Sequence, residues 1–341
     1  MPRSLSLRLL RSFALLCAFA AAGPAAGVAL AASSPSAADG VASLNALRTR
    51  VGVQTVTHDR SQSAGCRRHA AYYALTGHIG HEELPGDPGY TVRGDQAAQT
   101  SNLVYSENGF SGASDWVEAV YHRIAMLYPR LANSGYWAEN GIGCLGVLGA
   151  MSGPTVKQLT AFPYPADGQQ GVPVRFQCNE LPNPCSAVRG ASRNRPIGST
   201  LSLQFDAPQD SVDATSVASA TLTADGAAAP VSAVVQDESS RAVSPYLRGG
   251  MALLPRSPLA ISTWYTARVT GTVTVSDSRT GSQRLPFDVS WRFQTGPVVL
   301  SAVSTSKRCS PTRKAVTKSV KRCKAAAKKK AAAKKKAAKR R

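Results

Sequence analysis

Apolar positions recur with two different periods along the chain, and the change between them falls near residue 163. In the stretch "GVASLNALRTRVG", apolar side chains follow a helical spacing, at Val41, Leu44, Leu47 and Val51. The stretch "SAGCRRHAAYYALTG" predicts a second helix, which ends at Gly77. The first part of the chain is therefore expected to contain several helices.

A third helix and a buried strand are expected before the period changes. The stretch "SDWVEAVYHRIAMLYP" offers Ser114 as an N-cap, carries an apolar stripe and is stopped by Pro129. The stretch "NGIGCLGVLGAM" is small and apolar, which is typical of a buried strand. Together these elements predict a mixed helix-and-strand domain.

From residue 163 onward, short alternating runs are separated by Gly, Pro, Asp and Asn. Examples are "GSTLSLQFDAP", "TWYTARVTGTVTVSD" and "FDVSWRFQTG". Alternation with period two between regularly spaced turn residues predicts a β-sandwich. This part has no histidine and little clustering of charge, so we do not expect chemistry in it.

Both ends of the chain differ from these two parts in composition. Residues 1–31 combine three arginines, a long uncharged apolar run and the small-residue motif Ala29-Leu30-Ala31, which predicts a secretory signal peptide. An uncleaved anchor helix is the alternative. Residues 307–341 hold 17 Lys and Arg and no acid, so the two ends account for the whole formal charge of +20. Residues 298–341 are predicted to be a disordered basic tail on a nearly neutral folded part.

Six cysteines remain after Cys17 has left with the signal peptide. An even number in an exported chain predicts disulfides, although six cysteines allow 15 connectivities. Pairing within each region of the chain predicts three bridges: Cys66–Cys144, Cys178–Cys185 and Cys309–Cys323.

All five histidines lie between residues 58 and 122, and the 219 residues after His122 contain none. This clustering predicts that the first domain uses histidine. The stretch "TGHIGHEELPGD" places His78 and His81 three residues apart and follows them with two glutamates. The residues alone leave three interpretations open: a metal site, a catalytic base or a polar loop.

Several stretches, taken in order, resemble the bacterial secreted form of the CAP domain, also called the SCP domain. They are "LNALRTRVG", "VTHD", "CRRHAAYYALTGHIGHEE", "YSENG", "DWVEAVYHRIAMLYP" and "NGIGCLG", and the resemblance covers roughly residues 43–161. The resemblance implies an α/β fold, a CAP-type α-β-α sandwich over residues 40–160. Farther on, "YPADGQQGVPV" and "SWRFQTG" resemble bacterial Ig-like domains, which implies an all-β Ig-like sandwich over residues 163–297.

The resemblance to the CAP domain also implies a set of cleft residues. The cleft histidine of the family lies twelve residues after the histidine of the preceding helix, which from His69 selects His81. Glu107 matches the glutamate of the family's Glu-Asn step, and His122 matches the histidine of its His-Arg step. Some members of the family bind a divalent metal in this cleft, and imidazole and carboxylate ligands suit zinc-like ions.

Other titratable residues rank behind these three. His78 falls where the family has an aromatic residue. Glu118 lies one residue before the position at which the family has a second cleft glutamate. On a helix, that difference of one residue turns the direction of the side chain by about 100°. We expect two histidines to be structural and two glutamates to be solvated loop charges: His58 and His69, and Glu82 and Glu83.

Two functions remain open at this point. The first is a secreted, non-enzymatic CAP protein that binds a small ligand or a divalent metal. Its basic tail would hold the protein near the cell envelope by binding anionic wall polymers or lipid headgroups. The second is a metal-dependent hydrolase of peptides or envelope material that uses His81, Glu107 and His122. The missing second glutamate favours the first, so no residue is assigned a catalytic role. Export argues against nucleic acid as the main partner.

Overall fold

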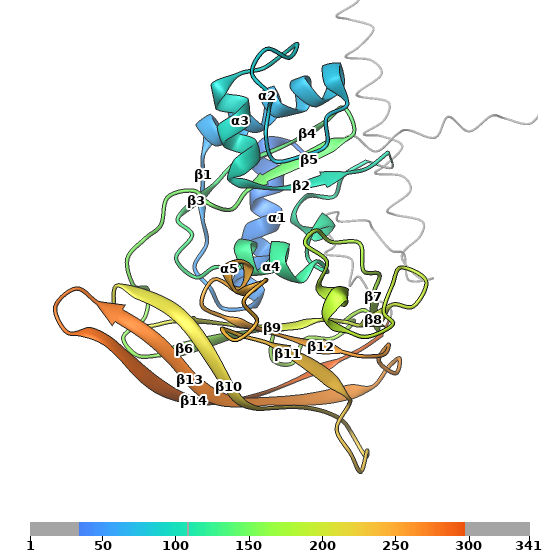
Figure 1. Cartoon of the computed structure of the whole chain (residues 1–341), viewed down its shortest axis with the longest axis vertical. Coiled ribbons are helices and arrows are strands. Elements are labelled where there is room, and N and C mark those ends of the chain that lie inside the picture. The colour runs from blue at the N-terminus through green and yellow to red at the C-terminus, as the bar shows by residue number, and fades with distance from the viewer. Residues whose placement is uncertain (1–33, 108, 297–341) are drawn as a thin grey trace, which may run out of the picture.

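The computed structural model describes residues 34–107 and 109–296 (Figure 1). The predicted signal peptide, the basic tail and the Cys309–Cys323 pair lie outside the described residues. The described part is a mixed α/β structure with mostly antiparallel sheets, which confirms the predicted class at that level. Within the described residues, no helix has the length and apolar character needed to cross a membrane.

The first unit is a three-stranded antiparallel sheet with helices on both faces. The sheet has the strand order β2-β5-β4, with bounds Ser101–Tyr105, Ile142–Gly146 and Tyr136–Glu139. Its helices are α1 (Ala37–Arg50), α2 (Arg60–Thr76) and α3 (Val92–Gln99), and a short parallel pair joins β1 (Thr57–His58) to β3 (Asn133–Ser134). Side chains alternate along β5, so Ile142 and Cys144 pack with α2 and α3, whereas Leu145 packs with α1. All five residues of β5 are buried because both of its faces are covered.

The first two helices begin and end on local signals in the sequence. Ser36 caps α1 by accepting the backbone N–H of Asp39, and Asp59 caps α2 by accepting that of Gln62. Gly77 ends α2 in the left-handed region, at φ 66°. Both predicted helices are confirmed.

The third predicted helix begins later than Ser114, and the prediction of an N-cap there is wrong. Residues Gly112–Asp115 form a 3-10 turn, η1, in which the Asp115 carboxylate accepts the backbone N–H of Ser111. The α-helix α4 covers only Val120–Met126, and its N-cap residue, Ala119, has no side chain that could cap it. The cap of α4 comes from a distant residue, described below.

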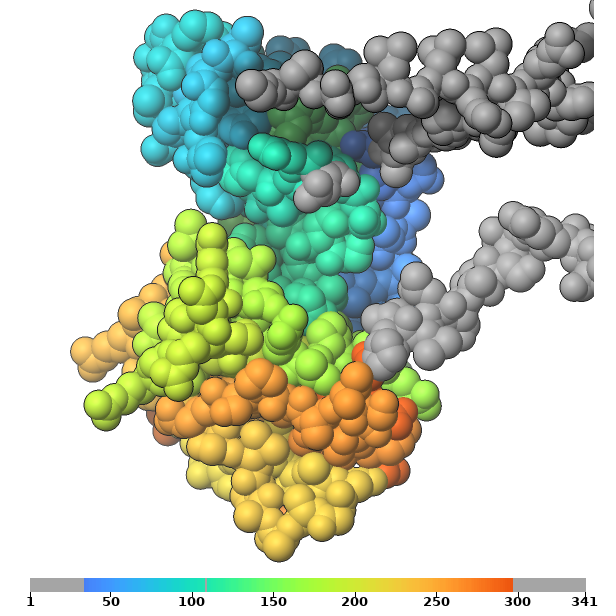
Figure 2. All heavy atoms as spheres, turned by 90° about the vertical axis from the view of Figure 1, so that its right-hand side faces the viewer, coloured from blue at the N-terminus to red at the C-terminus, as the bar shows by residue number. Residues whose placement is uncertain are grey.

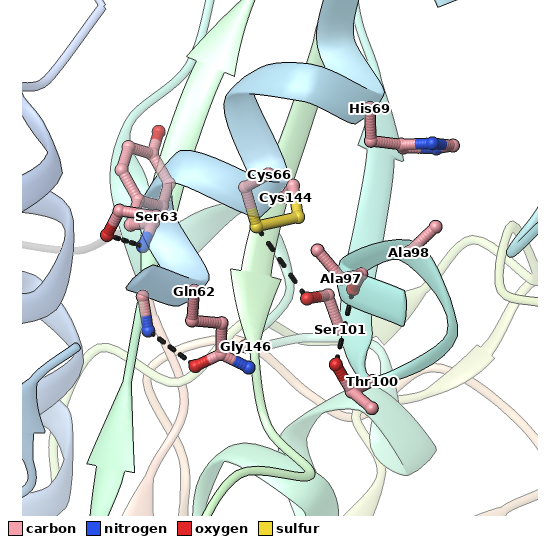
Figure 3. Close-up of a disulfide and its surroundings, with 12 residues drawn as sticks. Gln62, Ser63, Cys66, His69, Ala97, Ala98, Thr100, Ser101, Cys144 and Gly146 are labelled. Atoms are coloured by element: carbon pink, nitrogen blue, oxygen red, sulfur yellow. Dashed lines mark hydrogen bonds between the residues drawn. A yellow bond between two sulfur atoms is a disulfide. The ribbon is translucent and has the colours of Figure 1, made fainter. Parts of the chain in front are cut away.

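A disulfide between Cys66 and Cys144 joins α2 to β5 (Figure 3). The Cys66 sulfur contacts the hydroxyl of Ser101 at 3.7 Å. The neighbouring Gln62 side chain lies so close to Gly146 that a Cβ there would meet it at 2.0 Å. The structure also contains the second expected bridge, Cys178–Cys185.

The second unit consists of two antiparallel sheets packed face to face (Figure 1). One sheet has the order β11-β12-β9-β6, with bounds Ala233–Gln236, Met251–Pro255, Leu201–Asp206 and Thr160–Tyr164. The other has the order β10-β13-β14, with bounds Ser211–Ala224, Trp264–Asp277 and Gly281–Gln294. The predicted sandwich of two sheets is therefore present. Smaller elements complete the unit: β7 (Arg175–Phe176), β8 (Ile197–Gly198), the 3-10 turn η2 (Pro184–Ala187) and α5 (Ser244–Leu247).

Strand β9 joins the two units because its two faces have different neighbours. Leu203 faces the core of the sandwich, whereas Ser202 and Gln204 face α4 of the first unit. The buried Arg123 on α4 donates to the carbonyl oxygen of Thr200, and Gln204 donates to the carbonyl oxygen of Ile124. The two units therefore share a polar, buried contact along α4.

Candidate functional site

Two adjacent cavities lie where the first unit meets the segment around residues 176–182. Their volumes are about 740 Å³ and about 390 Å³, and His81, His122 and Leu181 line both. The space-filling view shows this segment of the second unit, in yellow-green, lying against the first unit (Figure 2). We call the two cavities together the cleft.

His122 is held in the cleft by a carboxylate of the second unit. Its Nδ1 atom lies 2.7 Å from Oε1 of Glu180, and the imidazole is only 15% exposed. The same oxygen accepts the backbone N–H groups of Tyr121 and His122, at 2.7 Å and 2.9 Å. Glu180 thus caps α4 and orients the His122 ring, which leaves Nε2 as the ring nitrogen available to the cleft.

Glu180 was not among the residues selected from the sequence. It is 3% exposed, and its second oxygen, Oε2, is buried without a hydrogen-bond partner among the described residues. One signal in the sequence could have indicated it, since it is the only acid between Asp167 and Asp206 and it stands inside the loop that Cys178 and Cys185 close. The pairing with His122 itself could not be read from the sequence, because the two residues are 58 positions apart.

His81 lies in the loop that follows α2, on the wall of the cleft. Its Nδ1 atom is 2.9 Å from the carbonyl oxygen of Ala98, so this nitrogen carries the proton when the ring is neutral. Among the described residues, the Nε2 atom of His81 then has no hydrogen-bond partner and can act as an acceptor, as in His122. The structure therefore brings His81 and His122 to one cleft, each with its Nδ1 atom already bonded.

The other three residues selected from the sequence lie elsewhere or play a different part. Glu107 follows strand β2 in the chain and is exposed, and it is not among the residues that line either cavity. Glu118 does line the larger cavity, where its carboxylate accepts a hydrogen bond from the hydroxyl of Ser199 at 3.4 Å. Burial raises the pKa of Glu118, although the positive charge of Arg123 acts to lower it. His78 does not line either cavity, and its ring forms a T-shaped pair with that of Tyr72.

Large apolar side chains stand exposed around the cleft. Ile79, Leu148, Leu181 and Tyr246 line one or both cavities and are 66%, 47%, 82% and 46% exposed. Exposed apolar groups that gather at a concave site are typical of a binding surface. The cleft therefore combines two oriented imidazoles with an apolar rim.

No protein-family model matches the chain, and no curated protein matches it either. Its function is therefore inferred from the cleft. Within the described residues, no group of three or more His, Cys, Asp or Glu side chains is placed to hold a metal ion.

A second histidine–glutamate pair is fully buried between α2 and the loop that follows it. The Nδ1 atom of His69 lies 3.3 Å from Oε1 of Glu83, and Oε2 of Glu83 accepts the backbone N–H of Thr91. The prediction that Glu83 is a solvated loop charge is wrong, because it is 3% exposed and pairs with the helix histidine. His58 and His69 have the structural surroundings expected of them, His58 through a hydrogen bond to Ser63.

The buried His69 predicts a loss of stability in mild acid. Burial, with the nearby charge of His81, lowers the pKa of His69 from 6.5 to about 4 in the folded protein. The unfolded chain therefore takes up a proton first, so stability present above pH 6.5 is lost as the pH falls towards 4. The loss from this residue reaches about 3 kcal/mol. Urea unfolding at pH 7.5 and pH 4.5 measures it.

The variant His69→Gln separates this effect from the titration of carboxylates. Its stability should fall less between the two pH values than that of the wild type, because glutamine binds no proton. Equal losses in both proteins would show that His69 does not set the pH dependence.

Proposed function

We propose that the protein is an exported, CAP-like binding protein that holds a small, partly apolar ligand in the cleft between its two units. The observation that carries the proposal is the convergence of His81 and His122 at the shared wall of the two cavities. Each ring offers one free nitrogen to a ligand, and the exposed rim offers apolar area.

Two features support the CAP-like and Ig-like parts of the proposal. Helices cover both faces of the β2-β5-β4 sheet, as an α-β-α sandwich requires, and the motifs that resemble the family lie in order on α1, α2 and α4. The two facing sheets of the second unit are compatible with an Ig-like module. The two disulfides suit an oxidising compartment and so support export.

A resident zinc-like ion is not part of this proposal. Structural zinc sites use four protein ligands, and catalytic sites use three. The cleft is lined by two imidazoles and by the carboxylates of Asp115, Glu118 and Glu180, and Glu107, the third ligand expected from the sequence, is not part of the lining. No three such side chains among the described residues are placed to hold a metal ion, so the lining does not supply the ligand set that a zinc-like ion needs. Attachment to the envelope through the basic tail stays an expectation from the sequence, because the tail lies outside the described residues.

Binding of an uncharged fluorescent probe tests the cleft. We expect N-phenyl-1-naphthylamine, which is apolar and small enough for these volumes, to bind with enhanced fluorescence. The variant Leu181→Asp should weaken binding about tenfold, since covering a leucine side chain is worth about 1.5–3 kcal/mol.

The matched control is Ile261→Asp, which changes another exposed apolar residue, 64% exposed against 82% for Leu181, that does not line the cleft. It should bind the probe as the wild type does. Equal weakening in both variants, or no binding to the wild type, would remove the cleft as the binding site.

A further inference from the structure

The pair formed by His122 and Glu180 has the arrangement of a general base and the carboxylate that orients it. The carboxylate is buried, and its Oε1 atom is fixed by two backbone N–H groups as well as by the ring. An anion placed in this way holds the proton on Nδ1 and stabilises the imidazolium that forms when Nε2 takes up a proton. The ring is thereby prepared to accept a proton from a molecule in the cleft.

The rest of the lining favours an uncharged substrate with an apolar part. The cleft is lined by three carboxylates, those of Asp115, Glu118 and Glu180, and by two arginines, Arg193 and Arg248, so it has no excess of positive charge that would attract an anion. The apolar rim favours a hydrocarbon group at the mouth of the cleft. Esters of short acyl chains combine both properties.

We propose that the cleft hydrolyses an uncharged ester without a metal ion, with His122 as the general base and Glu180 as the residue that positions it. This inference rests on the proposed function, because the ester must first bind in the cleft. Nε2 of His122 removes a proton from water as the water oxygen bonds to the acyl carbon. The bond from that carbon to the alkoxy oxygen then breaks, and the imidazolium returns its proton to the leaving alcohol. Water is the only co-reactant, and the products are a carboxylic acid and an alcohol.

The two members of the histidine–glutamate pair come from different units, because Glu180 belongs to the β-sandwich unit. The base lies on α4 of the first unit, whereas the group that orients it lies in the loop closed by Cys178 and Cys185. Neither unit holds the complete pair. The second unit is therefore part of the reactive site in this proposal, although its sequence predicts no chemistry.

Hydrolysis of 4-nitrophenyl butyrate by the full chain tests the inference. The variant His122→Gln should lower kcat/KM by about 100-fold, the lower end of what a general base contributes. The variant His78→Gln makes the same change at a histidine outside the described lining and should leave the rate unchanged. A chelator such as EDTA should also leave the rate unchanged.

The variant Glu180→Gln separates positioning from a purely structural role. It should lower kcat by about tenfold with little change in KM, because the imidazole loses the group that orients it while the surface that binds the ester is kept. A merely structural role would lower the melting temperature and leave the kcat of the folded protein as it is in the wild type. If this variant does not fold, the comparison of His122→Gln with the wild type still decides the main claim.

The outcomes distinguish failure of this inference from failure of the proposed function. A wild type that binds the naphthylamine probe but hydrolyses the ester no faster than His122→Gln overturns the hydrolytic site and leaves the binding cleft. Loss of hydrolysis in EDTA also overturns the metal-free reaction. A wild type that neither binds the probe nor hydrolyses the ester overturns both proposals.

Discussion

Replacing Arg48 by methionine is expected to lower the free energy of unfolding by about 3–5 kcal/mol. Arg48 lies on α1 and is fully buried, and its guanidinium donates to five backbone carbonyl oxygens, those of Gln54, Met126, Tyr128, Pro129 and Leu131. Methionine would leave these oxygens buried without donors, and each such loss is costly. Urea unfolding at neutral pH measures the change.

Arg50 offers the matched control, because it lies on the same helix and is exposed. Arg50→Met should change stability by less than about 0.5 kcal/mol. If the two variants lost similar amounts, the carbonyl cluster around Arg48 would have no special part in stability.

Removing the Cys66–Cys144 bridge is expected to cost about 4 kcal/mol. The bridge joins residues 78 positions apart, so it restricts the unfolded chain strongly, and in the folded state it ties α2 to β5. The double variant Cys66→Ala, Cys144→Ala should therefore unfold at clearly lower urea concentration under oxidising conditions.

The second bridge provides an internal comparison. Cys178 and Cys185 are only 7 positions apart, so their double replacement by alanine should cost about 2 kcal/mol. A larger loss from the short loop than from the long one would mean that packing around each bridge, and not the length of chain it closes, determines its contribution.

The elements that local signals define could be predicted from the sequence. α1 and α2 have a capping side chain at the start, an apolar spacing, and in α2 a glycine at the end, and in each helix these signals lie close together in the sequence. The start of α4 could not be found in this way. Its capping group is Glu180, which only the folded chain brings to the helix, so the serine that looked like an N-cap was the wrong choice.

In the candidate site, too, residues within local sequence motifs could be predicted, whereas residues that only the fold brings together could not. His81 and His122 were selected from the resemblance to a family, and the structure does bring them to one cleft. Glu83 was expected to be a solvated loop charge and Glu180 was not selected at all, yet each is buried against a histidine. Burial of a carboxylate depends on which segments fold over it, and hydrophobic periodicity carries no information about that.

The buried polar contact between the two units restricts the exchange of domains during the evolution of this protein. Arg130 is almost fully buried and forms an ion pair with Asp206 of the second unit at 2.7 Å, and Arg123 is enclosed beside Thr200 in the same contact. A recombination event that replaced the second unit by an unrelated module would remove Asp206 from Arg130 and the Thr200 oxygens from Arg123. It would also remove the carboxylate from His122. Related proteins should therefore retain the two units together. Sequence variation among them should concentrate in the loops of the sandwich that lie far from α4.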